Sequence, residues 1–326
     1  MTRLVRVELA RYRSRRVIAL LLLLAVAVAA LVAAKSAWDT RPITAQEAAT
    51  ARANAEMEPE SGDVKQELTS CLANPTQYLG TGATVQDCRD NFTGSPSNYL
   101  PRRPLDLAGT LKGNGLGVAL LVAGLLVIAA STFAGSDWGS GSMVTQLVFE
   151  PRRARMWAAK GVAVTVASGL AAVVVIGGFW LTLYLVAVDR GVPHGSAVMS
   201  DVGWHVMRAV LFCMGAALGA FALTMLFRHS VATLSLLFAY SVGGEILAVL
   251  APFDNVGRWT LGNNVYGWLE TQLKYFDPTA PCARIGECRG FQHIGHLQSA
   301  TYLAVLLVVA VVVSVVAFRR RDVRLD

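Results

Sequence analysis

Charged residues are scarce in this sequence, and they are almost absent from six long stretches. Only 16% of the 326 residues are charged, while 54% are apolar; a soluble domain carries about a quarter charged residues. This shortage excludes a cytosolic enzyme, and it excludes a nucleic-acid-binding protein despite a pI of 9.4. The sequence also lacks a GxxxxGK[ST] phosphate-binding loop. We therefore expect no nucleotide site of the usual kind in this chain, and no enzymatic activity.

The uncharged stretches predict an all-α integral membrane protein with six transmembrane helices. Each stretch is close to the roughly 20 apolar residues that a helix needs to cross a bilayer. The predicted spans are residues 17–34, 116–133, 162–188, 206–227, 231–251 and 299–318. The segments between and around them are an interfacial helix at 1–16, an external cap at 35–115, a cytoplasmic loop at 134–161, an external loop at 252–298 and a cytoplasmic tail at 319–326.

The placement of positive charge predicts that both termini lie in the cytoplasm. Six spans put the termini on one side of the membrane, together with residues 134–161 and 228–230. These segments carry 15 basic residues against 5 acidic ones, and positive flanks favour the cytoplasmic side. The 24 arginines against 5 lysines suggest a GC-rich bacterial genome. We therefore expect a multi-pass protein of the bacterial cell membrane.

The N-terminal residues predict a basic helix that lies on the inner surface of the membrane. Val5, Leu9 and Tyr12 recur at helical spacing, and arginines fill the other face. A signal peptide is the alternative interpretation of residues 1–37. Its usual apolar core of about 7–15 residues is shorter than the run of 18 residues in this segment, which favours a retained span.

The cysteines predict disulfides in the two external segments. Pairs outside the cell fit an oxidising compartment, and local pairing is the simplest of the three possible connectivities. The four residues concerned are Cys71, Cys88, Cys282 and Cys288. A zinc site at Cys282, Cys288, His293 and His296 is the alternative, but its spacing suits no common zinc module. We expect no metal site.

The external cap is predicted to contain short helices. Thr44 and Glu47 have the spacing of a capping box before an Ala/Glu-rich run that ends at Pro59, and a second helix is expected from Asp63 to Leu72. The cap is too short and polar to bury a large core, so a disulfide would stabilise it. The aromatic residues of the external loop are expected at the headgroup level, with a substrate-gating helix as the alternative.

Arg208 and Glu245 are the two ionisable residues inside the predicted spans. A charge within the membrane is a candidate for a gate or pathway, because its burial is costly unless it is paired. Arg208 also has the length to reach the interface with its guanidinium. Glu245 follows two glycines, and its alternative role is that of a hydrogen-bonded structural carboxylate.

The cytoplasmic loop at 134–161 is predicted to hold a short helix that docks against another protein. Gly139, Ser140 and Gly141 interrupt the second span, Ser142 is suited to cap a helix, and Pro151 ends it. Apolar pairs four residues apart, Met143 with Leu147 and Val144 with Val148, give this helix an apolar side. The alternative is a surface helix that rests on lipid.

The same loop resembles the loop between the second and third spans of ABC transporter type-2 permeases. The residues that carry the resemblance are Asp137-Trp138-x-x-Gly141-Ser142-Met143, Leu147, Pro151-x-Arg153 and Lys160. Asp137 stands where the family usually has Glu, Ser142 where it has Thr, and the proline lies about one residue from the commonest spacing. Leu4-Val5-Arg6-Val7-Glu8-Leu9, followed by Arg15-Arg16, is similar to the family's opening helix.

This resemblance implies a function. Residues 142–149 would be the coupling helix that fits a groove of a separate ABC ATP-binding subunit, which would hold ATP and Mg while this chain holds no cofactor. A second permease copy would complete an exporter of a hydrophobic or amphipathic small molecule, a lipid or a peptide. The alternative is a non-transporting membrane sensor or scaffold with an external ligand-binding cap. A secondary carrier ranks third, because no internal repeat is visible and few charges lie in the spans.

Overall fold

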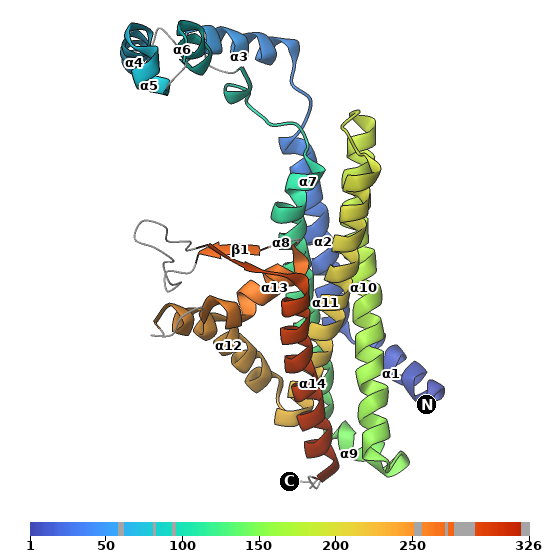
Figure 1. The fold of residues 1–326 in the computed structure, drawn as a ribbon. Helices are drawn as coiled ribbons and strands as arrows, with labels where there is room; N and C mark the ends of the chain where they lie inside the picture. The colour runs from blue at the N-terminus through green and yellow to red at the C-terminus, as the bar shows by residue number, and fades with distance from the viewer. Residues whose placement is uncertain are drawn as a thin grey trace. The chain divides into compact units, whose positions relative to one another are not determined.

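The computed structural model is almost entirely helical, as predicted (Figure 1). It describes residues 1–57, 62–80, 83–92, 96–250, 256–270, 273–276 and 291–320. Six helices in the described residues are long and apolar enough to cross a membrane. The chain is therefore a multi-pass helical membrane protein. The predicted pair Cys282–Cys288 lies outside the described residues.

The chain divides into two compact units. The bundle unit comprises Met1–Ala33, Asp106–Val186 and Pro193–Asp326. The disulfide unit comprises Ala34–Leu105 and Ala187–Val192. Two of the long helices, α2 and α10, continue from the first unit into the second.

Most of the long helices extend beyond the apolar runs that predict them. They are α2 (Arg16–Asp39), α8 (Leu116–Gly139), α10 (Arg153–Asp189), α11 (Ser196–Phe227), α12 (Ser230–Leu250) and α14 (His296–Arg320). A short helix α7 (Leu107–Thr110) and a π-helical turn η3 (Leu111–Gly115) lead directly into α8. Polar residues at a helix end keep the same backbone hydrogen bonds as apolar ones, so the ends do not follow hydropathy. The limits of the membrane itself stay a prediction.

Helix α11 forms the centre of the bundle unit and packs against α8 and α14 (Figure 1). Its buried face includes Ala209, Cys213, Ala217 and Ala220, which recur every three or four residues. Small side chains at this spacing let neighbouring helix backbones approach closely, which is how helices associate in membranes. Helix α10 joins the same core through Trp157, whose indole N–H donates to the buried hydroxyl of Ser314 on α14 (3.1 Å).

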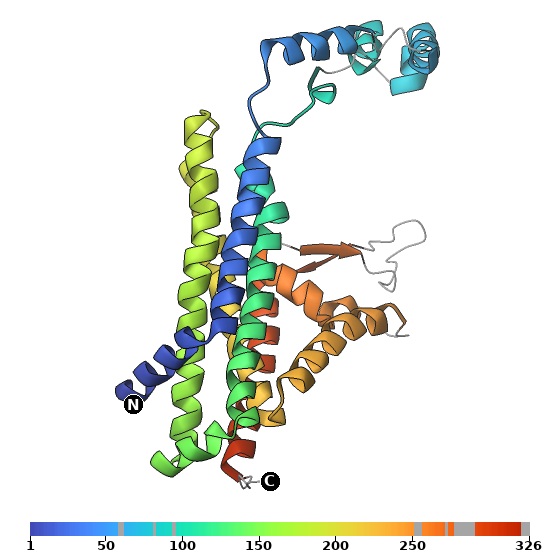
Figure 2. The ribbon, with the colours of Figure 1, turned by 180° about the vertical axis from the view of Figure 1, so that it is seen from behind.

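The segment between α12 and α14 folds back on itself instead of forming a simple loop. Figures 1 and 2 show α12 slanting away from α14 and the following helix returning to it. The returning elements are the turn η4 (Val256–Trp259), α13 (Leu261–Leu269), and the antiparallel strands β1 (Leu273–Phe276) and β2 (Phe291–Ile294). The Thr260 hydroxyl caps α13 by accepting from the N–H of Asn263. Among the described residues, these two strands are the departure from an all-helical chain.

The disulfide unit is a small group of short helices. They are α3 (Ala45–Met57), α4 (Gly62–Ala73), α5 (Pro75–Leu79) and α6 (Val85–Phe92), followed by the turn η2 (Pro96–Asn98). The predicted disulfide Cys71–Cys88 is confirmed and joins α4 to α6. The predicted capping box is also confirmed: the Thr44 N–H donates to Glu47 (2.9 Å), and the Glu47 N–H donates to the Thr44 hydroxyl (3.3 Å).

Helix α1 (Thr2–Ser14) precedes the first long helix, as the basic N-terminal segment predicts. Arg15 has an extended backbone (φ −78°, ψ 118°) and separates α1 from α2. The buried residues of α1 are Glu8 and Tyr12, whereas Val5 and Leu9 of the predicted apolar face are half-buried. Glu8 is buried because it takes part in an ion-pair network.

Candidate functional site

A sharp turn connects α8 to the short helix α9 (Ser142–Phe149), which has the bounds of the predicted docking helix. Helix α8 ends at Gly139, and the N–H groups of Ser140 and Gly141 return to the carbonyls of Ser136 and Trp138 (3.1 and 3.2 Å). Gly141 then adopts a left-handed conformation (φ 70°, ψ 0°). This conformation is costly for residues with a Cβ, so the glycine permits α9 to begin immediately.

Helix α9 presents an apolar pair to the surroundings. Met143 at its beginning is completely buried, while Val148 and Phe149 at its end are 75% and 86% exposed. Glu150 is extended, and Pro151 follows it, so the helix ends where a residue before proline favours extended backbone. The first turn of α9 is therefore fixed in the bundle unit, while its last residues are exposed.

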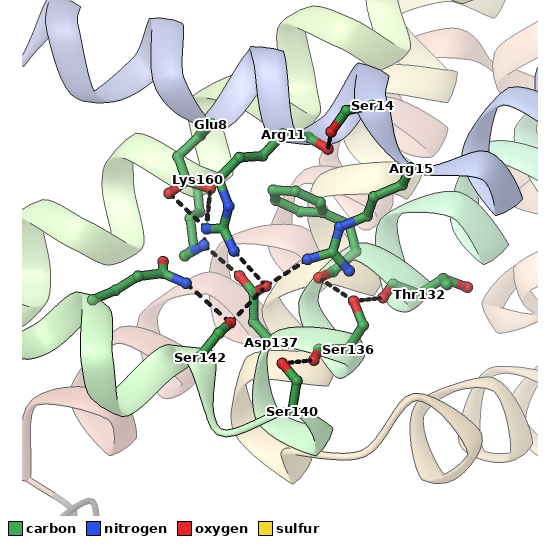
Figure 3. A network of polar contacts seen from close by, with 12 residues as sticks. Glu8, Arg11, Ser14, Arg15, Thr132, Ser136, Asp137, Ser140, Ser142 and Lys160 are labelled. Atoms are coloured by element: carbon green, nitrogen blue, oxygen red, sulfur yellow. Dashed lines mark hydrogen bonds and ion pairs between the residues drawn. The ribbon is translucent and has the colours of Figure 1, made fainter.

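The anchor is a set of five charged residues, which we call the charge cluster: Glu8, Arg11, Arg15, Asp137 and Lys160 (Figure 3). Its centre is Asp137 on α8, which accepts from Lys160 (2.5 Å), Arg15 (2.5 Å) and Arg11 (3.0 Å). Lys160 on α10 also donates to Glu8 on α1 (2.9 Å). The side chains of Asp137 and Lys160 are 0% exposed.

The charge cluster also fixes the start of α9. The Ser142 hydroxyl donates to Asp137 Oδ1 (3.2 Å) and accepts from the Gln146 amide (3.2 Å) (Figure 3). The expectation that Ser142 caps α9 is wrong. The N-cap position is Gly141, with no side-chain cap bond, and Ser142 is the first residue of the helix. Its hydroxyl links α9 to Asp137 instead.

Two aromatic rings, Phe133 and Tyr12, lie beside the charge cluster. The Phe133 ring has the Arg15 guanidinium 5.0 Å and the Lys160 ammonium 5.2 Å from its centroid, within the range of cation–π attraction. The Tyr12 ring of α1 packs edge-on against the same phenylalanine, with centroids 5.2 Å apart. Burial raises the pKa of Tyr12 to about 12. Tyr12 thus anchors one face of α1 to α8, and Glu8 anchors the same face to Lys160 of α10.

The composition of the charge cluster decides how strongly it holds the helices together. Three cations and two carboxylates give a net charge of about +1, and every member has an opposite charge within ion-pair distance. Buried charges that lose a partner cost several kcal/mol, because the remaining charge is left desolvated. The arrangement therefore favours one relative position of α1, α8 and α10.

The predicted docking residues fall into two groups. Asp137, Met143 and Lys160 are buried within the chain. The others are half-buried or exposed: Gly141, Ser142, Leu147, Pro151 and Arg153. The structure brings Asp137, Ser142 and Lys160 together, with Asp137 bonded to both of the others.

Sequence reasoning missed the part of this site that α1 supplies: Glu8, Arg11 and Arg15 of the charge cluster. A signal for them is present in the sequence, because Glu8 is the single acidic residue in a segment with six arginines. At the exposed end of α9, Val148 belongs to a predicted apolar pair, and Phe149 lies in the predicted helix but is not singled out by the sequence.

Arg208 and Glu245 are each bonded within the bundle unit. The Arg208 guanidinium donates to Nε2 of His296 (2.6 Å), whose Nδ1 faces the carbonyl of Gly267 (3.0 Å). Glu245 Oε1 accepts from the N–H of Gly262 at the start of α13 (3.0 Å). This contact ties α12 to α13, and a role of either residue in a gate stays a prediction. In the part of the chain that the structure describes, no group of three or more His, Cys, Asp or Glu residues is placed to hold a metal.

Comparisons with protein-family models, with curated proteins and with solved structures find no match to this chain.

Proposed function

We propose that this chain is the permease subunit of an ATP-driven ABC exporter and that α9 docks on a separate ATP-binding subunit. The observation that carries the proposal is the exposed apolar pair Val148–Phe149 on a helix whose base is anchored by the charge cluster. Apolar side chains exposed to this extent favour a contact with another protein or with lipid. The resemblance of the loop to type-2 permeases favours the protein.

The energy source would lie in the partner. The sequence has no phosphate-binding loop, so ATP and Mg would be held by the ATP-binding subunit. The loop between α8 and α10 would then face the cytoplasm, in agreement with the excess of arginine in the segments on that side. Along the chain, one membrane crossing, α8, separates this loop from residues 40–106. Those residues would therefore lie outside the cell, where a disulfide is stable.

The charge cluster would transmit a movement of α9 to the long helices. A force on α9 acts on Gly141 and Ser142, and Ser142 is bonded to Asp137 of α8. Asp137 is in turn paired with Lys160 of α10 and with the arginines at the end of α1. A rigid-body movement of the partner would therefore move α1, α8 and α10 together, as alternating access requires.

Helix α12 supports the presence of a second permease copy. Its segment Ser230–Leu247 has the lowest mean hydropathy of the six candidate spans. Only 6% of that segment is buried inside the molecule, which is also the lowest share of the six. A helix of this composition is better matched by a protein surface or a polar path than by lipid on most sides. We propose that a second copy, identical or related, covers part of it.

The cargo is proposed on the resemblance alone. An exporter of this kind would move a hydrophobic or amphipathic small molecule, a lipid or a peptide. Identification of the compound bound to the purified complex would establish the substrate class.

The test is co-purification of the chain with an ATP-binding subunit encoded beside its gene. We expect Phe149→Asp to abolish the complex and ATP-driven transport, because it places a charge in an apolar contact. Leu147→Asp, on the half-buried side of α9, should uncouple ATP hydrolysis from transport. Val85→Asp, at an exposed apolar residue of α6, is the matched control and should behave as the wild type.

Folding is checked by size-exclusion profile and thermal unfolding of each variant. If Phe149→Asp folds and still binds the ATP-binding subunit as the wild type does, α9 is not the docking element.

A membrane sensor or scaffold is the second candidate function, and the disulfide unit favours it. This unit has its own contacts, including the ion pair between Arg102 and Glu47 (2.6 Å) and the disulfide Cys71–Cys88. An independent external unit is suited to bind a ligand. A kinase or regulator, instead of an ATPase, as the co-purifying partner would support this candidate.

A further inference from the structure

Helix α1 divides its arginines between two opposite faces. Arg11, with Arg15 directly after the helix, turns toward the charge cluster, on the same side as the buried Glu8 and Tyr12. Arg3, Arg6 and Arg13 are exposed, and their spacing of three and seven residues places them on one opposite face. Glu8 is the single acidic residue of α1, and it is paired inside the molecule. The charged residues on the outer face of α1 are therefore all cationic.

The position of α1 sets the depth of this face relative to the bilayer. The extended backbone at Arg15 turns α1 away from the axis of α2, and both views show α1 leaving the bundle sideways at the start of that helix (Figures 1 and 2). The first residues of α2 include Val17, Leu20 and Leu23, whose side chains are exposed. Exposed apolar residues on a membrane-spanning helix face lipid, so α1 lies where the lipid tails end and the headgroups begin.

We propose that the outer face of α1 is a binding surface for anionic phospholipids, with Arg3, Arg6 and Arg13 contacting their phosphate groups. Guanidinium groups bind phosphate oxygens through paired N–H donors, which suits a headgroup better than a bulk ion. Val7 is 55% exposed beside these arginines and Ala10 lies between them. The face thus combines charge for the headgroups with apolar atoms for the region beneath them.

A bilayer fits this face better than an acidic protein does. The arginines follow one side of a helix that continues into a lipid-facing span, so a flat anionic surface reaches all three at once. The same helix carries Glu8 and Arg11 into the charge cluster on its other side. Lipid bound outside therefore holds α1 in the position in which Asp137 and Lys160 are buried, and the lipid composition would influence the loop that carries α9.

The experiment measures lipid at α1 directly. An environment-sensitive fluorescent amino acid replaces Ala10 in the full-length chain, and mixed micelles are titrated with phosphatidylglycerol or phosphatidylcholine. We expect a saturable change with phosphatidylglycerol and little change with phosphatidylcholine. Because each arginine near an anionic surface contributes about 1 kcal/mol, the triple variant R3Q/R6Q/R13Q should weaken the response on the order of 100-fold.

Two further variants separate charge from folding. The variant R3K/R6K/R13K keeps the charge and should retain most of the response. The variant R52Q/K65Q/R103Q removes the same number of charges from the disulfide unit, and it should respond as the wild type does. Higher salt should weaken the response of the wild type, since exposed charges are screened.

Three results would overturn the proposal. One is an equal response to phosphatidylcholine, and another is a wild-type response in R3Q/R6Q/R13Q. The third is a probe that ignores phosphatidylglycerol but responds to an added ATP-binding subunit, which would make the face a protein contact. None of these results depends on Phe149, so the proposed docking of α9 is tested separately.

Discussion

In the bundle unit, five charged side chains meet around the buried Asp137 and Lys160, whereas in the disulfide unit the ion pair Glu47–Arg102 lies among short polar helices. The bundle cluster joins α1, α8 and α10 through Asp137 and Lys160. The described residues of the disulfide unit include two long-range links, the covalent bond Cys71–Cys88 and the Arg102–Glu47 contact, and two capping boxes fix helix ends locally.

The difference follows from the amino-acid composition of each unit. Spans built largely of Ala, Val and Leu resemble one another, so apolar packing alone distinguishes poorly between alternative positions of the helices. A buried ion pair is satisfied in one position only, and it therefore specifies that position even where it adds little net stability. The disulfide unit buries few apolar residues, among them Ala51 and Ala55, and a small core of this kind depends on covalent links.

The largest expected effect is the loss of Asp137. Asp137→Ala removes the carboxylate that Lys160, Arg11 and Arg15 share. Arg15 loses this ion pair, and Glu8 is left as the partner of both Lys160 and Arg11. We expect the substitution to lower the free energy of unfolding by about 3–5 kcal/mol. The measurement is reversible unfolding in mixed detergent micelles.

A double variant tells whether this loss reflects unpaired charge. Asp137→Leu with Lys160→Met removes both central charges and should recover more than half of the stability that Asp137→Ala loses. A double variant as unstable as the single one would mean that the cluster itself supplies the stability, and our account of it would be wrong.

The second effect separates the two units. Cys71 and Cys88 close a loop with a sequence separation of 17 residues, and a disulfide of this loop length contributes about 3 kcal/mol. Cys71→Ser with Cys88→Ser should therefore accelerate hydrogen exchange in α4 and α6 while exchange in α8 and α11 stays unchanged. Faster exchange throughout the bundle would show that the two units do not unfold independently.

Sequence reasoning reached the features that depend on neighbouring residues. The six long helices follow from apolar runs, α9 follows from Gly139–Gly141 and Pro151, and the capping box follows from Thr44 and Glu47. The pairing Cys71–Cys88 was also accessible, because loop closure favours close partners.

The features that were missed depend on distant residues. Lys160 and Glu8 are 152 positions apart, and no local pattern indicates that they meet. For the same reason Asp137 and Lys160, which the sequence assigns to docking, prove to be buried. In the external loop the sequence offers a helix only as the alternative, and it does not locate α13, because a nine-residue helix has too few turns for a clear period.

A smaller effect is expected at the turn before α9. Gly141 has φ 70°, and nothing lies within 4 Å of a Cβ added there. Gly141→Ala should therefore cost about 1 kcal/mol through backbone strain alone, and Gly141→Asn should cost less because asparagine tolerates this conformation. The comparison is made by unfolding of both variants. A larger loss in Gly141→Asn than in Gly141→Ala would contradict the strain argument.

The smallest effect is a pH dependence confined to the disulfide unit. Hydrogen bonds from the Thr44 backbone N–H and from Arg102 lower the pKa of Glu47 from 4.5 to about 2. Since the folded state favours the ionised carboxylate, its contribution is complete above the unfolded pKa and declines as the pH falls from about 4.5 toward 2. Glu47→Gln should therefore be less stable than the wild type at neutral pH, with the difference shrinking in acid.

The measurement is the thermal unfolding of α3, followed by pulsed hydrogen exchange at a series of pH values. Asp87→Asn is the matched control, because Asp87 caps α6 in the same way. Hydrogen bonds from Thr84 lower the pKa of Asp87. That variant should lose its own cap while α3 keeps the pH response of Glu47. A difference between Glu47→Gln and the wild type that is independent of pH would show that the side chain acts through packing and not through its charge. In the bundle unit neither substitution should change the unfolding of α8, since Glu47 belongs to the disulfide unit and the charge cluster is held by its own partners.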